Sequence, residues 1–129
     1  MRFFESDVEL QLSKSEHLTK SQQNEEFVKT IDVSQMIGIE WAITVKFYAA
    51  LHYVQAYFAS RSGRTPATHD RRATAIQRDP LISGAYDDYR ELEDISREAR
   101  YDFSNLRQNN LKFADDCLVA VKSVVGLHL

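Results

Sequence analysis

The chain has 129 residues, of which 43% are hydrophobic and 27% are charged, and its formal net charge is −3. This composition is typical of one globular domain that buries its own core, and it excludes a disordered chain. Only 4 glycines and 2 prolines are present, which disfavours an all-β architecture because such folds need turn residues at every hairpin.

Cysteine usage and hydropathy give further limits. The single cysteine, Cys117, excludes an internal disulfide and a cysteine-based zinc site, and it fits a reducing cytosol. The N-terminal stretch lacks the apolar segment of a secretory signal. The one membrane candidate, residues 41–58, is interrupted by Lys46, His52 and Gln55, and a charge in mid-span is costly in lipid. We therefore expect a cytoplasmic protein without a membrane span.

The first element is ambiguous at its start. Residues 8–12 alternate between apolar and polar as in a strand, whereas S-x-x-E capping boxes begin at Ser6 and at Ser13. We predict a helix over residues 7–30, with its first turns open. Its inner face would carry His17, Ser21, Asn24, Phe27, Val28 and Ile31.

The most apolar element follows a short connection at residues 32–35. We predict a central helix over residues 37–60 that is apolar on nearly all sides and therefore surrounded by other helices. Gly63 is placed to end it in the left-handed conformation. Its apolar residues are Ile37, Trp41, Ile43, Val45, Phe47, Tyr48, Leu51, Tyr53, Val54, Tyr57 and Phe58.

Three more helices complete the prediction. Thr68 can cap a short helix that ends at Arg78, since Asp79-Pro80 cannot continue it. A fourth helix is predicted over residues 80–104, with Glu93 and Arg97 paired on its outer face, and Asn109 or Asn110 caps the last. The sum is a single all-α domain over residues 1–129, an up-down bundle of four long helices plus one short helix.

Positive charge is concentrated in one segment. Residues 61–78 hold five arginines and one acid, Asp70, a local charge of +4 on an otherwise acidic chain. Such an island is either a phosphate-binding patch or a solvated face that pairs with nearby acids. Arg71 and Arg72 lie at its centre.

Two histidines are candidate functional residues. His69 lies near the start of the short helix beside Arg71 and Arg72, where a titratable imidazole could move a proton at a phosphodiester; the alternative is a helix-capping histidine. His52 interrupts the central helix and is either a catalytic group or a core histidine satisfied by a neighbour. His17 is open to the same two interpretations, with surface exposure favoured.

Several enzyme classes can be set aside. The sequence contains no Gly-rich phosphate loop, no H-E-x-x-H and no G-x-S-x-G. Its acids are scattered along helix faces without the inward pairing of a glycosidase or di-metal site. We expect neither a metal nor a cofactor.

Three features together resemble the HEPN superfamily of small helical bundles. They are the aromatic and alanine-rich central helix, the P-x-x-H-x-x-R turn of Pro66, His69 and Arg72, and the S-R-x-A-R-Y segment at residues 96–101. The resemblance spans about residues 12–125. It implies a homodimer and, in active members, a metal-independent endoribonuclease in which a histidine and an arginine spaced R-x4–6-H act on RNA. Such members often serve as toxins or antiviral effectors beside a nucleotidyltransferase-type partner.

The usual motif is absent from the late helix, because no histidine follows Arg97 or Arg100 at the required spacing. The literal match lies elsewhere, at Arg64 and His69, which become the candidate catalytic pair. The candidate phosphate-binding residues are Arg71, Arg72, Arg100 and Tyr101, with His52 as a secondary candidate.

Two functions remain open from the sequence. The first is an RNA- or nucleotide-associated HEPN-like protein, at most a metal-independent endoribonuclease of toxin-antitoxin or defence type. The alternative is a non-catalytic dimeric interaction module, partner-like or antitoxin-like, that has lost the ribonuclease motif.

Overall fold

A computed structural model describes residues 11–102 and 105–129, and all regular structure in these ranges is helical. The all-α prediction is therefore confirmed for the described chain. The strand-like alternation at residues 8–12 and the first turns of the helix predicted over residues 7–30 fall mostly outside the described residues. The helices are α1 (Lys14–Val28), α2 (Met36–Ser62), α3 (His69–Arg78), the 3₁₀ turn η2 (Ser83–Ala85), α4 (Tyr86–Tyr101) and α5 (Gln108–Gly126).

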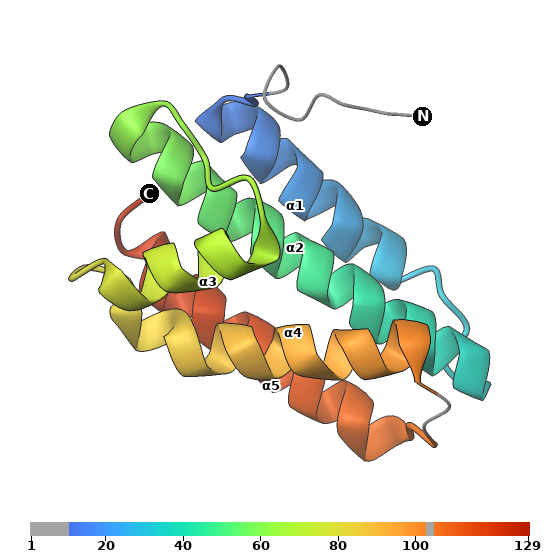
Figure 1. Cartoon of the computed structure of the whole chain (residues 1–129). Helices are drawn as coiled ribbons and strands as arrows, with labels where there is room; N and C mark the ends of the chain where they lie inside the picture. The colour runs from blue at the N-terminus through green and yellow to red at the C-terminus, as the bar shows by residue number, and fades with distance from the viewer. Residues whose placement is uncertain (1–10, 103–104) are drawn as a thin grey trace, which may run out of the picture.

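The 27-residue helix α2 is the centre of the molecule. Figure 1 shows α1 along one side of it and α4 with α5 along the other, while the short α3 lies against the beginning of α4. Residues that face these neighbours, such as Ile43, Phe47 and Val54, have no exposed surface. No helix in the described ranges has the length and apolarity needed to cross a membrane.

The first turns of α2 depart from the predicted burial. Ile37 is 61% exposed and Trp41 is 57% exposed, although the helix was expected to be covered on all sides. Because α1, α4 and α5 pack on other faces of α2, one stripe at its beginning has no helix against it. The apolar pattern alone could not distinguish this stripe from the buried ones.

Local capping chemistry sets most helix boundaries. Helix α1 begins at the second predicted capping box, in which the Ser13 hydroxyl accepts from the Glu16 backbone N–H at 3.1 Å; the box at Ser6 lies outside the described residues. Gly63 ends α2 with φ of 74°, as predicted. Thr68 accepts from the Arg71 N–H at 3.1 Å and starts α3, also as predicted.

The predicted fourth helix starts too early. The Asp79 carboxylate accepts from the backbone N–H groups of Leu81 at 2.8 Å and Ile82 at 3.2 Å, and the buried Tyr57 hydroxyl donates to the same carboxylate. This turn satisfies donors that a helix from residue 80 would leave open, so α4 begins only after η2. In α5, Asn110 accepts from the Arg107 N–H at 2.9 Å, and the helix begins at Gln108, before the predicted cap.

Gly38 gives a test of this packing. A Cβ at this position would overlap the Asp32 carbonyl, which the α1–α2 connection presses against α2. We expect Gly38→Ala to lower the free energy of unfolding by about 1–3 kcal/mol, as overpacking does, although alanine normally favours a helix. The measurement is urea denaturation followed by circular dichroism. Gly84→Ala is the control, because its nearest neighbour would be a Val124 methyl at 3.9 Å; equal stability of both variants would contradict the close approach.

Candidate functional site

Polar and charged side chains of α3 and α4 meet on one side of the bundle. We call this group the His69 cluster. The arrangement follows from helix periodicity, since positions three or four residues apart share a face. Its members are His69 and Arg72 from α3, and Glu93, Arg97 and Arg100 from α4.

The anchor of the cluster is the carboxylate of Glu93, which is only 1% exposed. One oxygen lies 3.5 Å from an Arg97 nitrogen and 3.6 Å from His69 Nδ1, and the other lies 3.6 Å from Arg90. Burial of an unpaired carboxylate would cost several kcal/mol, so the guanidinium groups of Arg90 and Arg97 are needed to compensate it. The prediction that Glu93 lies on an outer face of its helix is wrong, because α3 covers it.

The tautomer of His69 follows from its neighbours. Arg72 Nη1 lies 3.2 Å from His69 Nδ1, and a guanidinium can only donate hydrogen bonds. Nδ1 is therefore the acceptor, and the proton of the neutral ring is on Nε2. Burial, followed by the positive charge of Arg72, lowers the pKa of His69, while Glu93 opposes this shift. Near neutral pH the 44% exposed side chain is thus an uncharged N–H donor.

Arg100 extends the cluster along α4. Its guanidinium donates to the Ser96 hydroxyl at 3.1 Å, and its Cζ lies 5.3–5.7 Å from the ring centroids of Phe47, Tyr48 and Tyr101. Such cation–π contacts fix the orientation of an arginine while leaving its charge available. Phe47 also packs on His69, with ring centroids 5.8 Å apart, so its ring lies between the two polar groups.

A second polar pair lies between α1 and α2. His17 Nδ1 and His52 Nδ1 are 3.0 Å apart, so one ring donates to the other. Burial first, then the neighbouring His17 and the charges of Lys20 and Arg72, lowers the pKa of His52 to about 4. Burial and Arg72 lower the pKa of His17 as well. Both rings are neutral at pH 7, and this geometry matches the interpretation of His52 as a core histidine satisfied by a neighbour.

Arg72 acts on both the His69 cluster and the His17–His52 pair: it contacts His69, and its charge contributes to the lowered pKa of the other two histidines. Only 6% of its surface is exposed. Its Nη2 lies 3.5 Å from the Pro66 carbonyl, which also accepts from Gln55 at 2.9 Å. These bonds hold the connection between α2 and α3 against the bundle. Arg72 is therefore a positioning residue for this connection and for the His69 ring.

The remaining sequence-predicted residues lie apart from these contacts or at their edge. Arg64 is exposed in the connection before α3, and Arg71 is exposed in the first turn of α3. Tyr101 is 75% exposed and stacks on Arg100. The sequence-based selection missed Glu93 and Arg97 as site residues, although their spacing of four residues, with Arg90 three residues before Glu93, was a usable signal.

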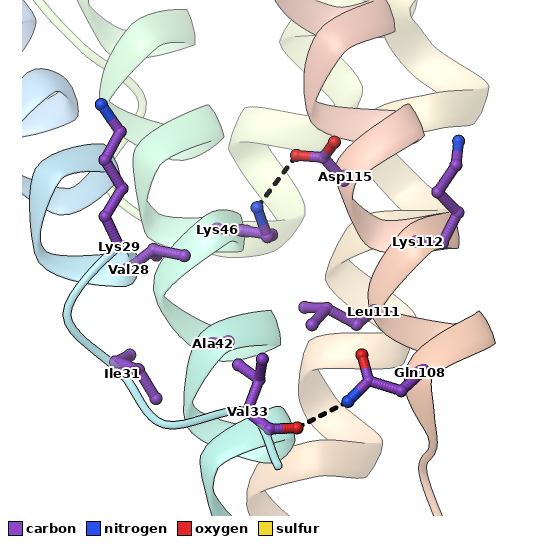
Figure 2. A pocket seen from close by; sticks show the side chains of 10 residues that line it. All are labelled: Val28, Lys29, Ile31, Val33, Ala42, Lys46, Gln108, Leu111, Lys112 and Asp115. Atoms are coloured by element: carbon purple, nitrogen blue, oxygen red, sulfur yellow. Dashed lines mark hydrogen bonds and ion pairs between the residues drawn. The ribbon is translucent and has the colours of Figure 1, made fainter.

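Figure 2 shows a different pocket, between the end of α1, α2 and α5. Lysines line it together with apolar side chains, but each lysine has a carboxylate partner: Lys46 with Asp115, Lys112 with Asp116, and Lys29 with Glu26. Gln108 closes one end by donating to the Val33 carbonyl at 2.6 Å. Since the positive charges are already compensated, the pocket is a weak candidate for an anionic ligand.

Three potential metal ligands of α4 and α5 lie close together. The ligand atoms of Asp88, Glu91 and Cys117 lie within 4.8 Å of one another. Burial and the two neighbouring carboxylates raise the pKa of Cys117 to about 11, which keeps the thiol protonated. Metal binding would have to displace that proton, so this group does not make a favourable metal site.

The depressed pKa of His52 predicts a pH dependence of stability. The unfolded chain takes up a proton near pH 6.5, whereas the folded state does so only near pH 4. Stability is therefore complete above pH 6.5 and falls as the pH drops toward 4. We expect His52→Asn, which cannot titrate, to flatten this part of the profile in urea denaturation between pH 4 and 8. His128→Gln is the control, because His128 is a histidine outside the His17–His52 pair. An unchanged slope in His52→Asn would show that His52 is not responsible for the pH dependence.

No protein-family model matches this chain, and the search of curated proteins returns no relative. What the site can do is therefore argued from the chemistry of its own residues.

Proposed function

We propose that this protein is HEPN-like and binds RNA through the His69 cluster. The observation that carries the proposal is the convergence of a neutral, partly exposed imidazole with three guanidinium groups from α3 and α4. Glu93 and Asp94, which lies 3.4 Å from Arg97, compensate two of the three arginine charges, and the cluster keeps a surplus of one positive charge. Charged N–H donors of this kind form the strong hydrogen bonds that phosphate oxygens accept.

The exposed members have distinct roles in this proposal. Arg97, whose side chain is 50% exposed, contacts phosphate directly. The Nε2–H of His69 donates to a phosphate oxygen. Arg100 adds its charge from a fixed position on the Phe47 and Tyr48 rings. Arg64 and Arg71 belong to the outer, long-range part of the positive field.

The resemblance extends the proposal beyond the cluster. It supports the up-down arrangement of four long helices and one short helix, a homodimer, a cytoplasmic location and a nucleotidyltransferase-type partner in a toxin-antitoxin or defence system. These properties are proposed from the likeness of the sequence alone.

A metal-independent endoribonuclease is the second candidate, favoured by the lowered pKa of the partly exposed His69. In RNA cleavage the 2′-hydroxyl loses a proton and the 5′-oxygen gains one. With Nδ1 occupied by Arg72, the neutral ring can donate a hydrogen bond from Nε2–H, but it has no free lone pair to accept a proton and no imidazolium proton to give to the 5′-oxygen. A base role would require the Arg72 contact to break, and for this reason binding is preferred over catalysis. The non-catalytic dimeric module keeps one supporting observation, the exposed apolar side chains at the start of α2.

Arg97 is the most exposed arginine of the cluster and is therefore the residue for testing RNA binding. Because it also compensates the buried Glu93, circular dichroism must first show that the variant is folded. We expect Arg97→Ala to weaken binding to single-stranded RNA and to lower the slope of log K against log salt by about 0.7, one contact fewer. Fluorescence anisotropy between 50 and ~300 mM salt measures both. Arg78→Ala, at the opposite end of α3, is the control. Identical behaviour of the two variants would show that the cluster does not contact phosphate.

The ribonuclease candidate is tested with a pool of RNA in the presence of a chelator. If the cluster cleaves RNA, His69→Ala should abolish cleavage and Arg64→Ala should leave it largely unchanged, because Arg64 lies outside the cluster. Product lengths on a denaturing gel give the measurement. Absence of cleavage by the wild type, alone and with its genomic neighbour, would eliminate the enzyme.

A further inference from the structure

A pocket of about 330 Å³ lies between the beginning of α2 and the end of α4. It is near the lower limit of volumes that hold small organic ligands. Its α2 wall is a single stripe, since the residues there are spaced by three or four positions. The lining residues are Ile37, Glu40, Trp41 and Thr44 from α2, and Ala99, Arg100 and Tyr101 from α4.

Two of the residues that line the pocket have exposed aromatic side chains. Trp41 is 57% exposed and Tyr101 is 75% exposed, and they belong to different helices. Aromatic rings presented to solvent around a pocket mark a binding surface more often than isolated aliphatic residues do. Planar aromatic ligands gain stacking energy from such rings.

Arg100 joins this pocket to the His69 cluster. Its guanidinium stacks on Tyr101 at 5.3 Å and on Phe47 at 5.7 Å, and Phe47 in turn packs on His69. The buried Arg100 Nε has no hydrogen-bond partner among the described residues. A nucleic acid whose phosphate lies at the cluster would therefore have the aromatic pocket beside it.

Glu40 makes the pocket unsuitable for a second phosphate. Its carboxylate would repel an anion, and no ion pair or hydrogen bond among the described residues engages that carboxylate. A carboxylate instead accepts two parallel hydrogen bonds from adjacent N–H donors. Of the RNA bases, guanine presents such a pair, N1–H and the N2 amino group, on its Watson–Crick edge.

We propose that this pocket binds a guanine base of the RNA whose phosphate is held by the His69 cluster. The base stacks between Trp41 and Tyr101, and the Glu40 carboxylate accepts from its N1–H and N2–H. The assignment rests on the proposed RNA binding and adds to it a base-specific position.

Trp41 is the only tryptophan of the chain, so its emission reports on this pocket alone. We expect guanosine 5′-monophosphate to quench it at concentrations roughly tenfold lower than adenosine 5′-monophosphate, the discrimination typical of a bidentate contact. Glu40→Gln should remove this preference while stacking, and thus quenching by adenine, persists. Tyr101→Ala should weaken both nucleotides about tenfold. Phe113→Ala, an exposed aromatic on α5, is the matched control.

The outcomes separate this inference from the proposed function. If Arg97→Ala weakens RNA binding but Tyr101→Ala and Trp41→Phe do not, the pocket assignment is wrong and RNA binding stands. If the free nucleotides quench Trp41 with guanine preference but RNA does not bind, the pocket is a nucleotide site and the proposed RNA binding fails. If Trp41→Ala turns a dimer into a monomer in sedimentation without changing nucleotide affinity, a second copy of this chain covers the patch, which overturns the assignment.

Discussion

The carboxylate of Glu93 is a buried negative charge on α4, and its compensation determines how α3 and its side chains are placed. Only 1% of the Glu93 surface is exposed, and the guanidinium groups of Arg90 and Arg97 lie 3.6 and 3.5 Å from its carboxylate oxygens. Nδ1 of His69 lies 3.6 Å from the same carboxylate. These contacts join α3 to α4, because His69 comes from one helix and the arginines from the other. A positively charged surface and a buried acid are thus two parts of one structure.

The same compensation defines the chemistry of His69. The ring lies between an acceptor, Glu93, and a donor, Arg72, which compete for Nδ1, and the shorter distance belongs to Arg72. The resulting neutral tautomer carries its proton on Nε2, which suits hydrogen bonding to a phosphate oxygen. A histidine that served as a general base would need the opposite arrangement, in which a carboxylate holds the Nδ1 proton and leaves the Nε2 lone pair free.

The arginines of the basic segment differ in burial. Arg72 is nearly buried and holds the connection before α3 through the Pro66 carbonyl, as a structural arginine would. Arg64 and Arg71 remain exposed on the surface. The charges that surround His69 come mainly from α4, from a part of the sequence about twenty-five residues further along the chain. Local charge density in the sequence therefore located one half of the cluster and not the other.

The sequence by itself determined the all-helical class and several helix ends, because these depend on local chemistry. The Ser13–Glu16 box, the left-handed Gly63 and the Thr68 cap act within a few residues of each other, and each works as predicted. It also selected His69, Arg72 and Arg100 as candidates, because the chemistry of an imidazole or a guanidinium group does not depend on its neighbours. Only the tertiary structure decided that Glu93 is buried and that one stripe of the apolar α2 is exposed. The physical reason is that burial and ion pairing depend on which helix packs against a given face, and a helical pattern describes the face without its partner.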